Sequence, residues 1–492
     1  MAQDVSNPQA AGFRFDNSWR RDLPAMALDQ HPDPAPEPHV LVLNTPLALS
    51  LGLDPDGLAA HPAWFAGGAL PAGAQPLALA YAGHQFGGYS PRLGDGRAHL
   101  LGEHLDPQGR RWDIQLKGSG RTPFSRGGDG KAALGPMLRE FLISEAMAAL
   151  GVPTSRSLAV ALTGEGVRRE EGVLPGAVVT RVASSHLRIG SFQYAAASGN
   201  PELLASLLDY AINRHDPDLA GQDGRALAFF DRVAARQTAL IAEWMGVGFV
   251  HGVMNTDNMT ISGETIDYGP CAFMEAYAPG TVFSSIDRQG RYAYGNQPLI
   301  LPWNLARLAE SLLPLLGESD AVVDLLNARL DGIAGEYRKA WLAVARRKLG
   351  LGGEAAADGD LVDDFLRLLA QEALDWTQSW RKLALIAEGR ADVFLAPIKD
   401  RAAAQAWIER WLARAGGASR DLAVRLRAVN PLVIPRNHQV EAALQAATAG
   451  DMQPFGALLA AVQRPFDEDP ALQGFSLPAP QGFGSYVTFC GT

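Results

Sequence analysis

Alternating apolar and polar residues predict three short strands, at 77–81, 98–103 and 111–117. The third is the clearest, because the apolar residues from Trp112 to Leu116 share one face and Lys117 ends the opposite face. Glycine-rich bends separate the first strand from the second, and an Asp-Pro-Gln-Gly turn separates the second from the third. The pattern therefore predicts a β-rich region in this part of the chain.

Two further apolar stretches, 157–162 and 177–183, predict strands, and the segments around them predict helices. One helix has Pro136 in its first turn and is closed by Gly151, and residues 201–247 are mostly helical. The chain after residue 300 is read almost entirely as amphipathic helix, at 303–316, 319–349, 360–388, 400–415, 420–428 and 438–448.

Changes in this pattern divide the chain into five parts. Residues 1–75 are expected to form a Pro-rich arm that packs on the core and is irregular up to about residue 40. Residues 76–195 are rich in strands, and 196–302 combine helices with a polar loop. Residues 303–464 form a helical region, and 465–492 form a Pro- and Gly-rich tail. The expected fold class is α+β.

The composition of the 492 residues, 47% hydrophobic and 20% charged, is ordinary for a globular protein. A net charge of −10 argues against a general nucleic-acid surface. No apolar run reaches the length of a bilayer span, and the N-terminus lacks the features of a secretory signal. The two cysteines, Cys271 and Cys490, do not suggest a secreted disulfide scaffold. We therefore expect a cytoplasmic protein without nucleic-acid or membrane partners.

A polar loop between apolar runs holds the most concentrated candidate chemistry. Its two carboxylates and two amides are Asn255, Asp257, Asn258 and Asp267. The short runs 259–261 and 265–266 predict a hairpin that holds this loop. Oxygen ligands of this kind are typical of a Mg²⁺ site, where phosphate oxygens complete the coordination. The alternative is a polar loop whose side chains only satisfy the backbone of their own turns.

A second group of candidates follows Lys117. The loop 118–131 carries five glycines together with Arg121, Arg126 and Lys131. Glycine lets backbone amides approach phosphate closely, and a lysine supplies a point charge for phosphate oxygens. We favour phosphate contact over a flexible lid with no ligand role. On the following helix, either Glu140 or Glu145 could reach Lys117 as an ion pair, or both could be solvated.

Two arginines add to this positive charge. Arg181 interrupts an apolar strand, which is costly unless its guanidinium finds an anion, and Arg188 follows soon after. The pair could clamp a triphosphate, or it could pair with Glu170 or Glu171 in the preceding charged run.

The order of these parts resembles that of the protein-kinase fold, in which a strand lysine pairs with a helix glutamate and a loop Asn and a later Asp hold metal ions. The matching residues are Lys117, Glu140, Asn258 and Asp267. One position departs. A kinase loop has its catalytic Asp two residues after the His, and this chain has Val253 there. Asp257 is the nearest substitute.

Four longer blocks are similar to signature blocks of the selenoprotein O family: 81–87, 115–126, 251–259 and 267–270. The similarity covers nearly the whole chain, which resembles a cysteine-containing, bacterial-type member. The resemblance implies a protein-kinase-like (pseudokinase) fold, with a β-rich N-lobe, a helical C-lobe and a large additional helical C-terminal region. It also implies a protein adenylyltransferase, which moves AMP from ATP to Ser, Thr or Tyr hydroxyls and binds ATP inverted relative to kinases.

The resemblance assigns roles by matching positions. Implied ATP contacts are Gly94, Gly96, Arg97, Lys117, Asp129, Gly130, Arg181, Arg188 and Asp267. Asn258 and Asp267 would hold Mg²⁺, with Mn²⁺ as an alternative. Asp257 would accept the proton, and Glu140 would pair with Lys117. ATP and proteins with Ser, Thr or Tyr hydroxyls are the implied partners.

The family also carries cysteine or selenocysteine third from the end, where this chain has Cys490. A redox link would have Cys271 as its candidate partner; a free Cys490 is the alternative. Besides AMP transfer, with UMP transfer as a variant, two other functions stay open: a protein or small-molecule kinase, and a non-catalytic nucleotide-binding pseudokinase.

Overall fold

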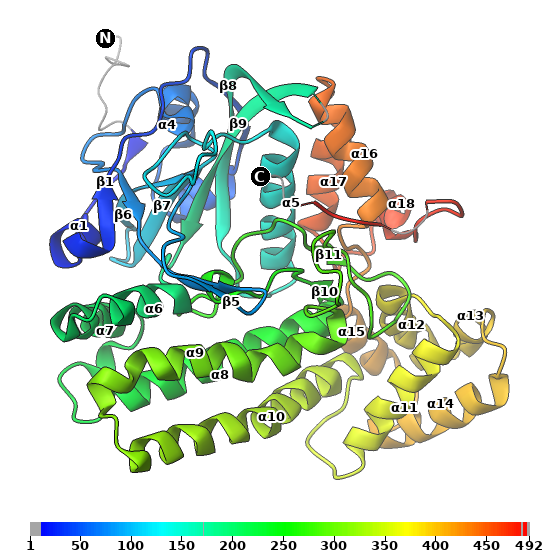
Figure 1. The fold of residues 1–492 in the computed structure, drawn as a ribbon. Coiled ribbons are helices and arrows are strands. Elements are labelled where there is room, and N and C mark those ends of the chain that lie inside the picture. The colour runs from blue at the N-terminus through cyan, green and yellow to red at the C-terminus, as the bar shows by residue number, and fades with distance from the viewer. Residues whose placement is uncertain (1–10, 171, 484–485, 490–492) are drawn as a thin grey trace.

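The computed structural model describes residues 11–170, 172–483 and 486–489 and has an α+β fold (Figure 1). Within these residues the main sheet has seven strands in the order β1–β3–β6–β7–β9–β8–β2, and each neighbouring pair is antiparallel. The strands are β1 (Ala27–Asp29), β2 (His39–Leu43), β3 (Leu77–Leu79), β6 (Ala98–Leu105), β7 (Arg111–Lys117), β8 (Arg156–Arg169) and β9 (Gly172–Ala183). Two small ribbons pair β4 (Gly83–Gln85) with β5 (Gly88–Ser90), and β10 (Phe249–Val250) with β11 (Ala272–Phe273).

Both faces of the main sheet are covered, so polar residues on β7 are as buried as apolar ones. Short N-terminal helices pack Trp64 and Phe65 with Ile114 and its neighbours on one face. These helices are α2 (Thr45–Ser50), α3 (Pro55–Ala59) and α4 (Pro62–Ala66). Helix α5 (Leu134–Ala149) packs through Phe141 on the opposite face. The side chains of Gln115 and Lys117 therefore face the interior between the sheet and α5, away from water.

The N-terminal segment is more ordered than the predicted irregular arm. Helix α1 (Ser18–Asp22) and strand β1 lie before residue 40, and β1 and β2 form the two edges of the sheet. Strand β2 pairs with β8, where His39 lies opposite Leu162. The prediction failed because the prolines near residue 35 occupy only the crossing between β1 and β2.

Helices make up most of the remaining described chain, apart from the loop-rich segment 251–296. Figure 1 shows α8, α9 and α10 running below the sheet, and α11 to α14 gathered at one end of them. The helices are α6 (Ile189–Ala197), α7 (Pro201–His215), α8 (Arg225–Val247), α9 (Gln297–Leu316), α10 (Asp320–Lys348), α11 (Asp358–Gln371), α12 (Trp376–Ala387), α13 (Ala391–Leu395), α14 (Arg401–Ala415), α15 (Arg420–Val429), α16 (Asn437–Thr448), α17 (Gln453–Val462) and α18 (Gln473–Ser476).

Most predicted C-terminal helices are confirmed, with three corrections. The stretch 360–388 is two helices, because Ala373 adopts a left-handed conformation (φ 49°) and Asp375 caps the second helix by accepting from Gln378 N at 2.7 Å. Helix α9 begins at Gln297, inside a segment predicted as loop. Helices α6 and α17 were not predicted.

The hairpin predicted at 259–266 is reduced to single bridges. Met259 pairs with Thr265, but Thr260 pairs with Arg188 and Thr265 also pairs with Thr154. The segment is too short to extend its own ribbon, and its backbone bonds go instead to two other parts of the chain. The polar loop is therefore held by tertiary contacts as well as by its own turn.

One described helical stretch, Tyr294–Leu316, is long and apolar enough to cross a membrane by length and composition alone. The sequence-based expectation was that no run reached that length. The buried side chains of this stretch include Leu301, Leu305 and Leu308, which belong to the main hydrophobic core. One face of the stretch is therefore packed in the core, and 39% of its apolar window is buried.

A cavity of about 240 Å³ lies where α5, α8, α10 and α15 end, away from the candidate residues named above. Its lining includes Lys348, whose ammonium lies 4.9 Å from the centre of the Trp380 ring. Burial lowers the pKa of Lys348 to about 7, although Glu243 acts in the opposite direction. A lysine so placed costs stability while it is charged.

Replacing Lys348 by Met is expected to raise the free energy of unfolding at pH 7 by about 1–3 kcal/mol. A lysine titrates near 10.4 in the unfolded chain, so between pH 7 and about 10 the unfolded state binds the extra proton and native stability rises with pH. The advantage of K348M should thus shrink toward pH 10. Urea unfolding at both pH values measures this, with K339M, at an exposed position of the same helix, as control. A K348M advantage that does not change with pH would contradict it.

Candidate functional site

A buried ion-pair cluster lies between the sheet and α5. Lys117, at the end of β7, donates from Nζ to Glu140 Oε2 at 2.7 Å and also contacts Asp267 Oδ1. Arg181, on the neighbouring strand β9, contacts Glu140 and donates from Nη2 to Asp267 Oδ1 at 2.7 Å. Two cations from the sheet are thus matched by one carboxylate from a helix and one from a loop.

The electrostatics of this cluster favour its charged form. Burial raises the pKa of Glu140, but Arg181 and Lys117 outweigh it and the net shift is downward. Burial likewise opposes ionisation of Asp267, and Lys117 and Arg181 hold its pKa well below the ordinary value. The side chain of Asp267 is 32% exposed, whereas that of Glu140 is 3% exposed. Asp267 is therefore the carboxylate of the cluster that a ligand can reach.

The backbone of Asp267 is unusual. Its φ is +70°, in the left-handed region that residues other than glycine seldom adopt. Its carbonyl accepts from Gly269 N at 2.8 Å, which closes a tight turn immediately after the carboxylate. Such conformations persist where surrounding contacts over-determine them, and here Lys117 and Arg181 hold the side chain.

The cluster resolves two alternatives left open by the sequence. Glu140, not Glu145, pairs with Lys117; Glu145 faces Arg156 instead, at 2.6 Å. Arg181 pairs with Glu140 and Asp267 and not with Glu170, while Glu171 lies outside the described residues.

Replacing Glu140 by Gln is expected to destabilise the fold by about 2–3 kcal/mol, because Lys117 and Arg181 would keep only one carboxylate between them. Glu145→Gln on the same helix removes a buried carboxylate that faces one partly exposed arginine, which water can still reach, so it should cost less, about 1–2 kcal/mol. Thermal unfolding of the two variants measures the difference. Equal losses would mean that the cluster contributes no more than the single Glu145–Arg156 pair.

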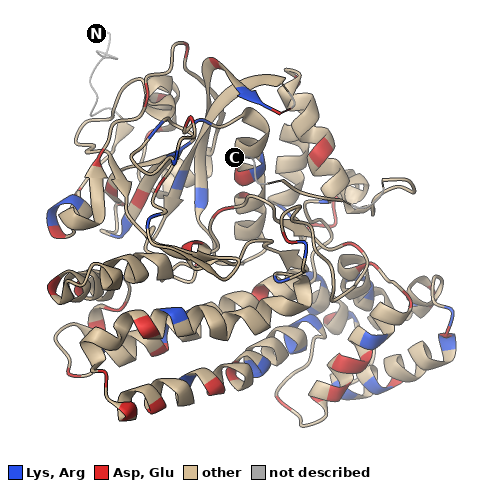
Figure 2. Cartoon of the chain, viewed as in Figure 1, with Lys and Arg blue, Asp and Glu red and all other residues tan. Residues whose placement is uncertain are grey.

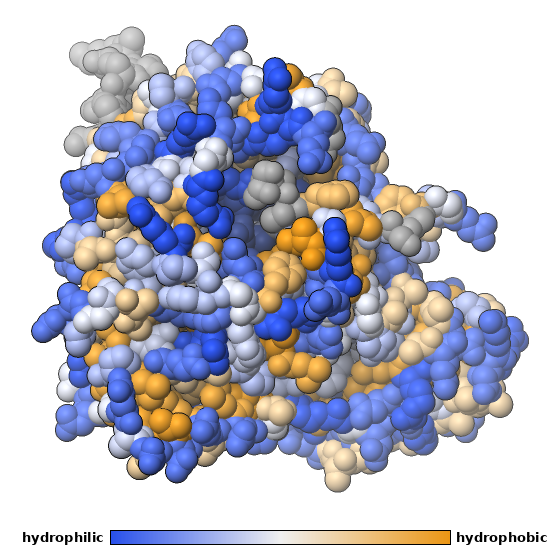
Figure 3. All heavy atoms as spheres, in the orientation of Figure 1, coloured by the Kyte–Doolittle hydropathy of each residue, from blue (hydrophilic) through white to orange (hydrophobic). Residues whose placement is uncertain are grey.

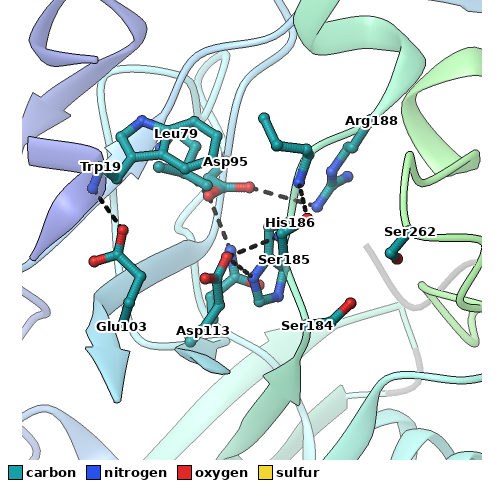
Figure 4. A network of polar contacts seen from close by, with 12 residues as sticks. Trp19, Leu79, Asp95, Glu103, Asp113, Ser184, Ser185, His186, Arg188 and Ser262 are labelled. Carbon is teal, nitrogen blue, oxygen red and sulfur yellow. Dashed lines mark hydrogen bonds and ion pairs between the residues drawn. The ribbon is translucent and has the colours of Figure 1, made fainter. Parts of the chain in front are cut away.

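Arg188 links this cluster to the polar loop. Its Nη1 donates to the Asp257 carbonyl at 2.9 Å, and its Nη2 lies 3.8 Å from Asp95 Oδ1 (Figure 4). The guanidinium also lies over the Tyr81 ring, 4.4 Å from its centre. Nε of Arg188 is buried without a hydrogen-bond partner among the described residues. Asp95 and Tyr81 were not predicted as site residues, because their contacts with Arg188 span about a hundred residues of sequence.

The segment before Arg188 is fixed from the sheet. Asp113 on β7 accepts from His186 N at 2.8 Å and lies 3.0 Å from His186 Nδ1, as Figure 4 shows. Arg214 from α7 contacts the same carboxylate and donates to the Ser184 carbonyl at 2.6 Å. The buried polar residues of this network therefore hold Arg188 against the polar loop.

The β4–β5 ribbon covers the polar loop. Gln85 Nε2 donates to Asp257 Oδ2 at 3.3 Å, and His84 N donates to Thr256 Oγ1 at 2.7 Å. Gly83 leaves no room for a side chain, since a Cβ there would lie 2.8 Å from Asp257 Oδ1. Burial raises the pKa of Asp257 to about 6, with Arg188 acting in the opposite direction. A carboxylate with such a pKa can take up a proton near neutral pH.

The loop also offers oxygen atoms for a metal ion. Oδ1 of Asn258 and Oδ1 of Asp257 are buried without hydrogen-bond partners, and Nδ2 of Asn258 is held by the Val253 carbonyl at 3.0 Å. Across the described residues, no group of three or more His, Cys, Asp or Glu side chains could hold a metal by itself. Mg²⁺ needs only one or two protein oxygens when phosphate supplies the others, so the available donors fit such a site.

The three glycines predicted to contact ATP are constrained by packing in two different ways. Gly94 and Gly96 flank Asp95 and are crowded by Phe124 of the glycine-rich loop; a Cβ at Gly94 would lie 2.2 Å from its ring. Arg97, on the same turn, is half-buried. The carboxylate of Asp129 pairs with Arg169 at 2.8 Å instead of with the cations of the cluster.

Gly130, beside Asp129, is required by the fold of the loop itself. Its φ is +69°, and a Cβ there would lie 2.1 Å from the Gly120 carbonyl oxygen. The close approach of two segments of the loop backbone therefore explains why position 130 is a glycine. Its contact with ATP, like that of Asp129, stays a prediction.

Figure 3 shows a depression near the middle of this face of the molecule, and Figure 2 shows, in the same orientation, basic positions on β7 and β9. Lys117 and Arg181 lie on these two strands. Positive charge near a concave surface concentrates anionic ligands there.

Of the two cysteines in the predicted redox pair, only Cys271 lies in the described part of the chain. Cys271 is buried and has no disulfide partner among the described residues, and burial raises its pKa to about 12 despite nearby Arg139, so as a thiol it holds little thiolate at neutral pH. Cys490 lies outside the described residues. Thr488, two residues before it, donates from Oγ1 to the Pro270 carbonyl at 2.7 Å, directly beside Cys271.

Cations paired with buried carboxylates beside glycine-rich turns are typical of enzyme sites that bind the phosphates of a nucleotide. The family model described as "Protein adenylyltransferase SelO" matches residues 14–463. The chain belongs to this family, and it is a nucleotidyltransferase.

Similar proteins align with this chain over nearly its whole length. A "Protein nucleotidyltransferase YdiU" of Cereibacter sphaeroides (strain KD131) is 57% identical over 484 residues, which cover 98% of this chain and 100% of the relative. Proteins of the same name are 55% identical in Mycobacterium sp. (strain KMS), over 97% of this chain and 99% of the relative, and 53% identical in Pseudarthrobacter chlorophenolicus, over 100% of both.

Proposed function

We propose that this nucleotidyltransferase moves AMP from ATP to Ser, Thr or Tyr hydroxyls of proteins. The observation that carries the proposal is the joint cluster of Lys117, Arg181 and Asp267, with Arg188 and Asp257 alongside. These groups come from strands, a loop and a helix start that are far apart in sequence. Their assembly supplies cations for phosphates and a carboxylate for a proton within one region.

We also propose that the fold is kinase-like, with ATP bound in the inverted direction. In support, a strand lysine pairs with a helix glutamate, as Lys117 and Glu140 do, and an Asp before Gly follows the polar loop. The departure at Val253 removes the base that a kinase uses for γ-phosphoryl transfer. Inversion presents the α-phosphate for attack, which gives the same groups a different product.

In the proposed reaction the acceptor hydroxyl oxygen forms a bond to the α-phosphorus, and the bond from that phosphorus to the β,γ-pyrophosphate breaks. Asp257 takes the hydroxyl proton, since its buried carboxylate has an unpartnered Oδ1. Lys117, Arg181 and Arg188 balance the charge that develops on phosphate oxygens. Asn258 and Asp267 would hold Mg²⁺ or Mn²⁺, which when bound neutralises charge on the triphosphate and the leaving pyrophosphate.

Labelled nucleotides test the proposal. The purified protein is incubated with a cell extract and ATP labelled at either the α- or the γ-phosphate. We expect protein-bound label from α-labelled ATP alone, and loss of that label when EDTA removes divalent metal. Label from the γ-phosphate alone would identify a kinase, and α-labelled UTP in a parallel arm tests UMP transfer. No labelling from any donor would leave a nucleotide-binding protein without transferase activity.

A further inference from the structure

Asp95 is a buried carboxylate to which neither the sequence nor the proposed reaction assigns a role. Its side chain is 2% exposed, and it lies between Gly94 and Gly96, two of the predicted ATP contacts. Burial raises the pKa of Asp95, and Arg188 acts most strongly in the opposite direction. Because a buried carboxylate is costly unless its charge is balanced, its partners indicate what it does.

Three parts of the chain fix Asp95 in one orientation. Its Oδ2 accepts from Gln115 Nε2 on β7 at 3.0 Å and from Leu79 N on β3 at 3.3 Å. Its backbone carbonyl accepts from Thr122 Oγ1, in the glycine-rich loop, at 2.6 Å. Oδ1 is left to face Arg188, as Figure 4 shows. The carboxylate is therefore anchored to the sheet through one oxygen and turned toward Arg188 through the other.

The guanidinium of Arg188 is held from several sides, and one of its nitrogens stays available. Nη1 donates to the Asp257 carbonyl at 2.9 Å, the Tyr81 ring centre lies 4.4 Å from the guanidinium carbon, and Nε is buried without a partner. Nη2 lies 3.8 Å from Asp95 Oδ1, which is longer than a hydrogen bond. Within the described chain Nη2 donates no hydrogen bond, and unlike Nε it is not sealed inside the protein. Asp95 thus balances the charge of Arg188 and leaves Nη2 free to donate to a ligand.

We propose that Asp95 is a positioning residue for the transfer reaction, which holds the Arg188 guanidinium with Nη2 directed at the phosphates of the bound nucleotide. Asp95 itself touches no reacting atom. The turn that carries it also carries Gly94 and Gly96, so one turn would place both the nucleotide and the arginine that contacts it. This inference rests on the proposed AMP transfer, in which Arg188 balances charge on phosphate oxygens.

Both the charge of Asp95 and its distance from Arg188 matter to this role. If the carboxylate were a close hydrogen-bonded partner, Nη2 would be occupied and could not donate to phosphate. Without the carboxylate, the buried guanidinium would keep only a carbonyl and an aromatic ring as partners, and it could shift toward them. A misplacement of about 1 Å in a group that acts on the reacting phosphate can cost about 10²-fold in rate. Removing the charge of Asp95 should therefore act on catalysis through Arg188.

A double-mutant cycle between Asp95 and Arg188 tests the inference. In single-turnover transfer from α-labelled ATP, D95N should lower the rate about 30-fold and R188Q about 100-fold. The double variant should be slower than R188Q by no more than about threefold, because Asp95 has nothing to position once the guanidinium is gone. Independent effects would multiply to about 3000-fold instead and would overturn the inference.

The division of the loss between kcat and KM separates positioning from a general loss of folded enzyme. D95N and R188Q should both raise the KM for ATP about threefold or more, whereas a smaller folded fraction lowers the apparent kcat and leaves KM unchanged. Gln115→Met removes the amide donor to Oδ2 and keeps every charge, so it tests the same role even if D95N does not fold. It should raise KM in the same direction and lower the rate about fivefold. Asp358→Asn removes a buried, ion-paired carboxylate in the C-terminal helical region and should keep the wild-type kcat and KM.

Failure of the inference is distinguishable from failure of the proposed function. Calorimetry with ATP and Mg²⁺ repeats the cycle on binding, without any transfer. Coupling between D95N and R188Q in ATP affinity, in a wild type that transfers no AMP, would refute the proposed function and keep the role of Asp95 beside the nucleotide. An active wild type whose D95N variant stays within about twofold in rate and KM, or loses kcat alone, would overturn the inference.

Discussion

Asparagine in place of Asp267 is expected to lower nucleotide transfer by about 10⁴-fold. The variant keeps the shape of the side chain but removes the charge that Lys117 and Arg181 share with the phosphate site. It also removes a proposed metal ligand, and such electrostatic losses reach several kcal/mol in the transition state. Single-turnover transfer from α-labelled ATP measures the effect, with a large change in kcat.

The fold must be shown to survive this substitution. Asp267→Asn leaves Glu140 to balance two cations, so some stability is lost. Asp358→Asn is the matched control, because Asp358 is buried and pairs with Arg414 at 2.8 Å, in the C-terminal helical region. It should lose comparable stability and keep transfer activity. A D267N enzyme within tenfold of the wild-type rate would exclude Asp267 from the phosphate site.

Asp257→Asn is expected to lower kcat about 10³-fold while ATP affinity changes by less than about threefold. A general base contributes roughly 10²–10⁴ in rate, and asparagine cannot accept the proton. Stability should not fall, because burial already opposes the charged form of this carboxyl, whose pKa is raised to about 6. Calorimetric ATP binding, thermal unfolding and single-turnover transfer separate the three effects.

Two outcomes would change the role of Asp257. Near-normal transfer by D257N would mean that the carboxyl only orients the polar loop through Gln85. A loss of ATP affinity equal to the loss of rate would place Asp257 among the nucleotide contacts. Gln85→Glu is a useful companion variant, because it removes the amide donor next to Asp257 Oδ2 and leaves the backbone unchanged.

Local patterns predicted the elements that carry the cluster, and long-range packing decided the pairing within it. The alternation on β7 placed Lys117 correctly, and helix periodicity offered two glutamates. Both Glu140 and Glu145 are buried, so periodicity alone could not choose between them; the positions of Arg156 and Arg181 did. Contacts between residues about a hundred positions apart, such as those of Arg188 with Tyr81 and Asp95, left no local signal.

The missed parts of the fold have similar causes. Prolines near residue 35 hid two edge strands, because proline content marks the crossing and not the segments beside it. The break within 360–388 depends on a left-handed alanine and an aspartate cap, neither of which interrupts the apolar pattern. The order of the strand with Lys117, the helix with Glu140, the polar loop and Asp267 was visible in sequence because each part has its own local signature.

The two edge strands have a consequence for how the molecule is made. Strand β2 emerges early in synthesis, but its partner β8 is made more than a hundred residues later. His39, for example, cannot pair until Leu162 has been synthesised. An apolar strand that stays unpaired on the ribosome can pair with the wrong strand or with another chain, and contacts between residues so far apart in sequence slow folding. A truncation that removes residues 1–43 would leave β8 as a long, unpaired edge strand. Such truncated forms should aggregate before they lose the ability to bind nucleotide.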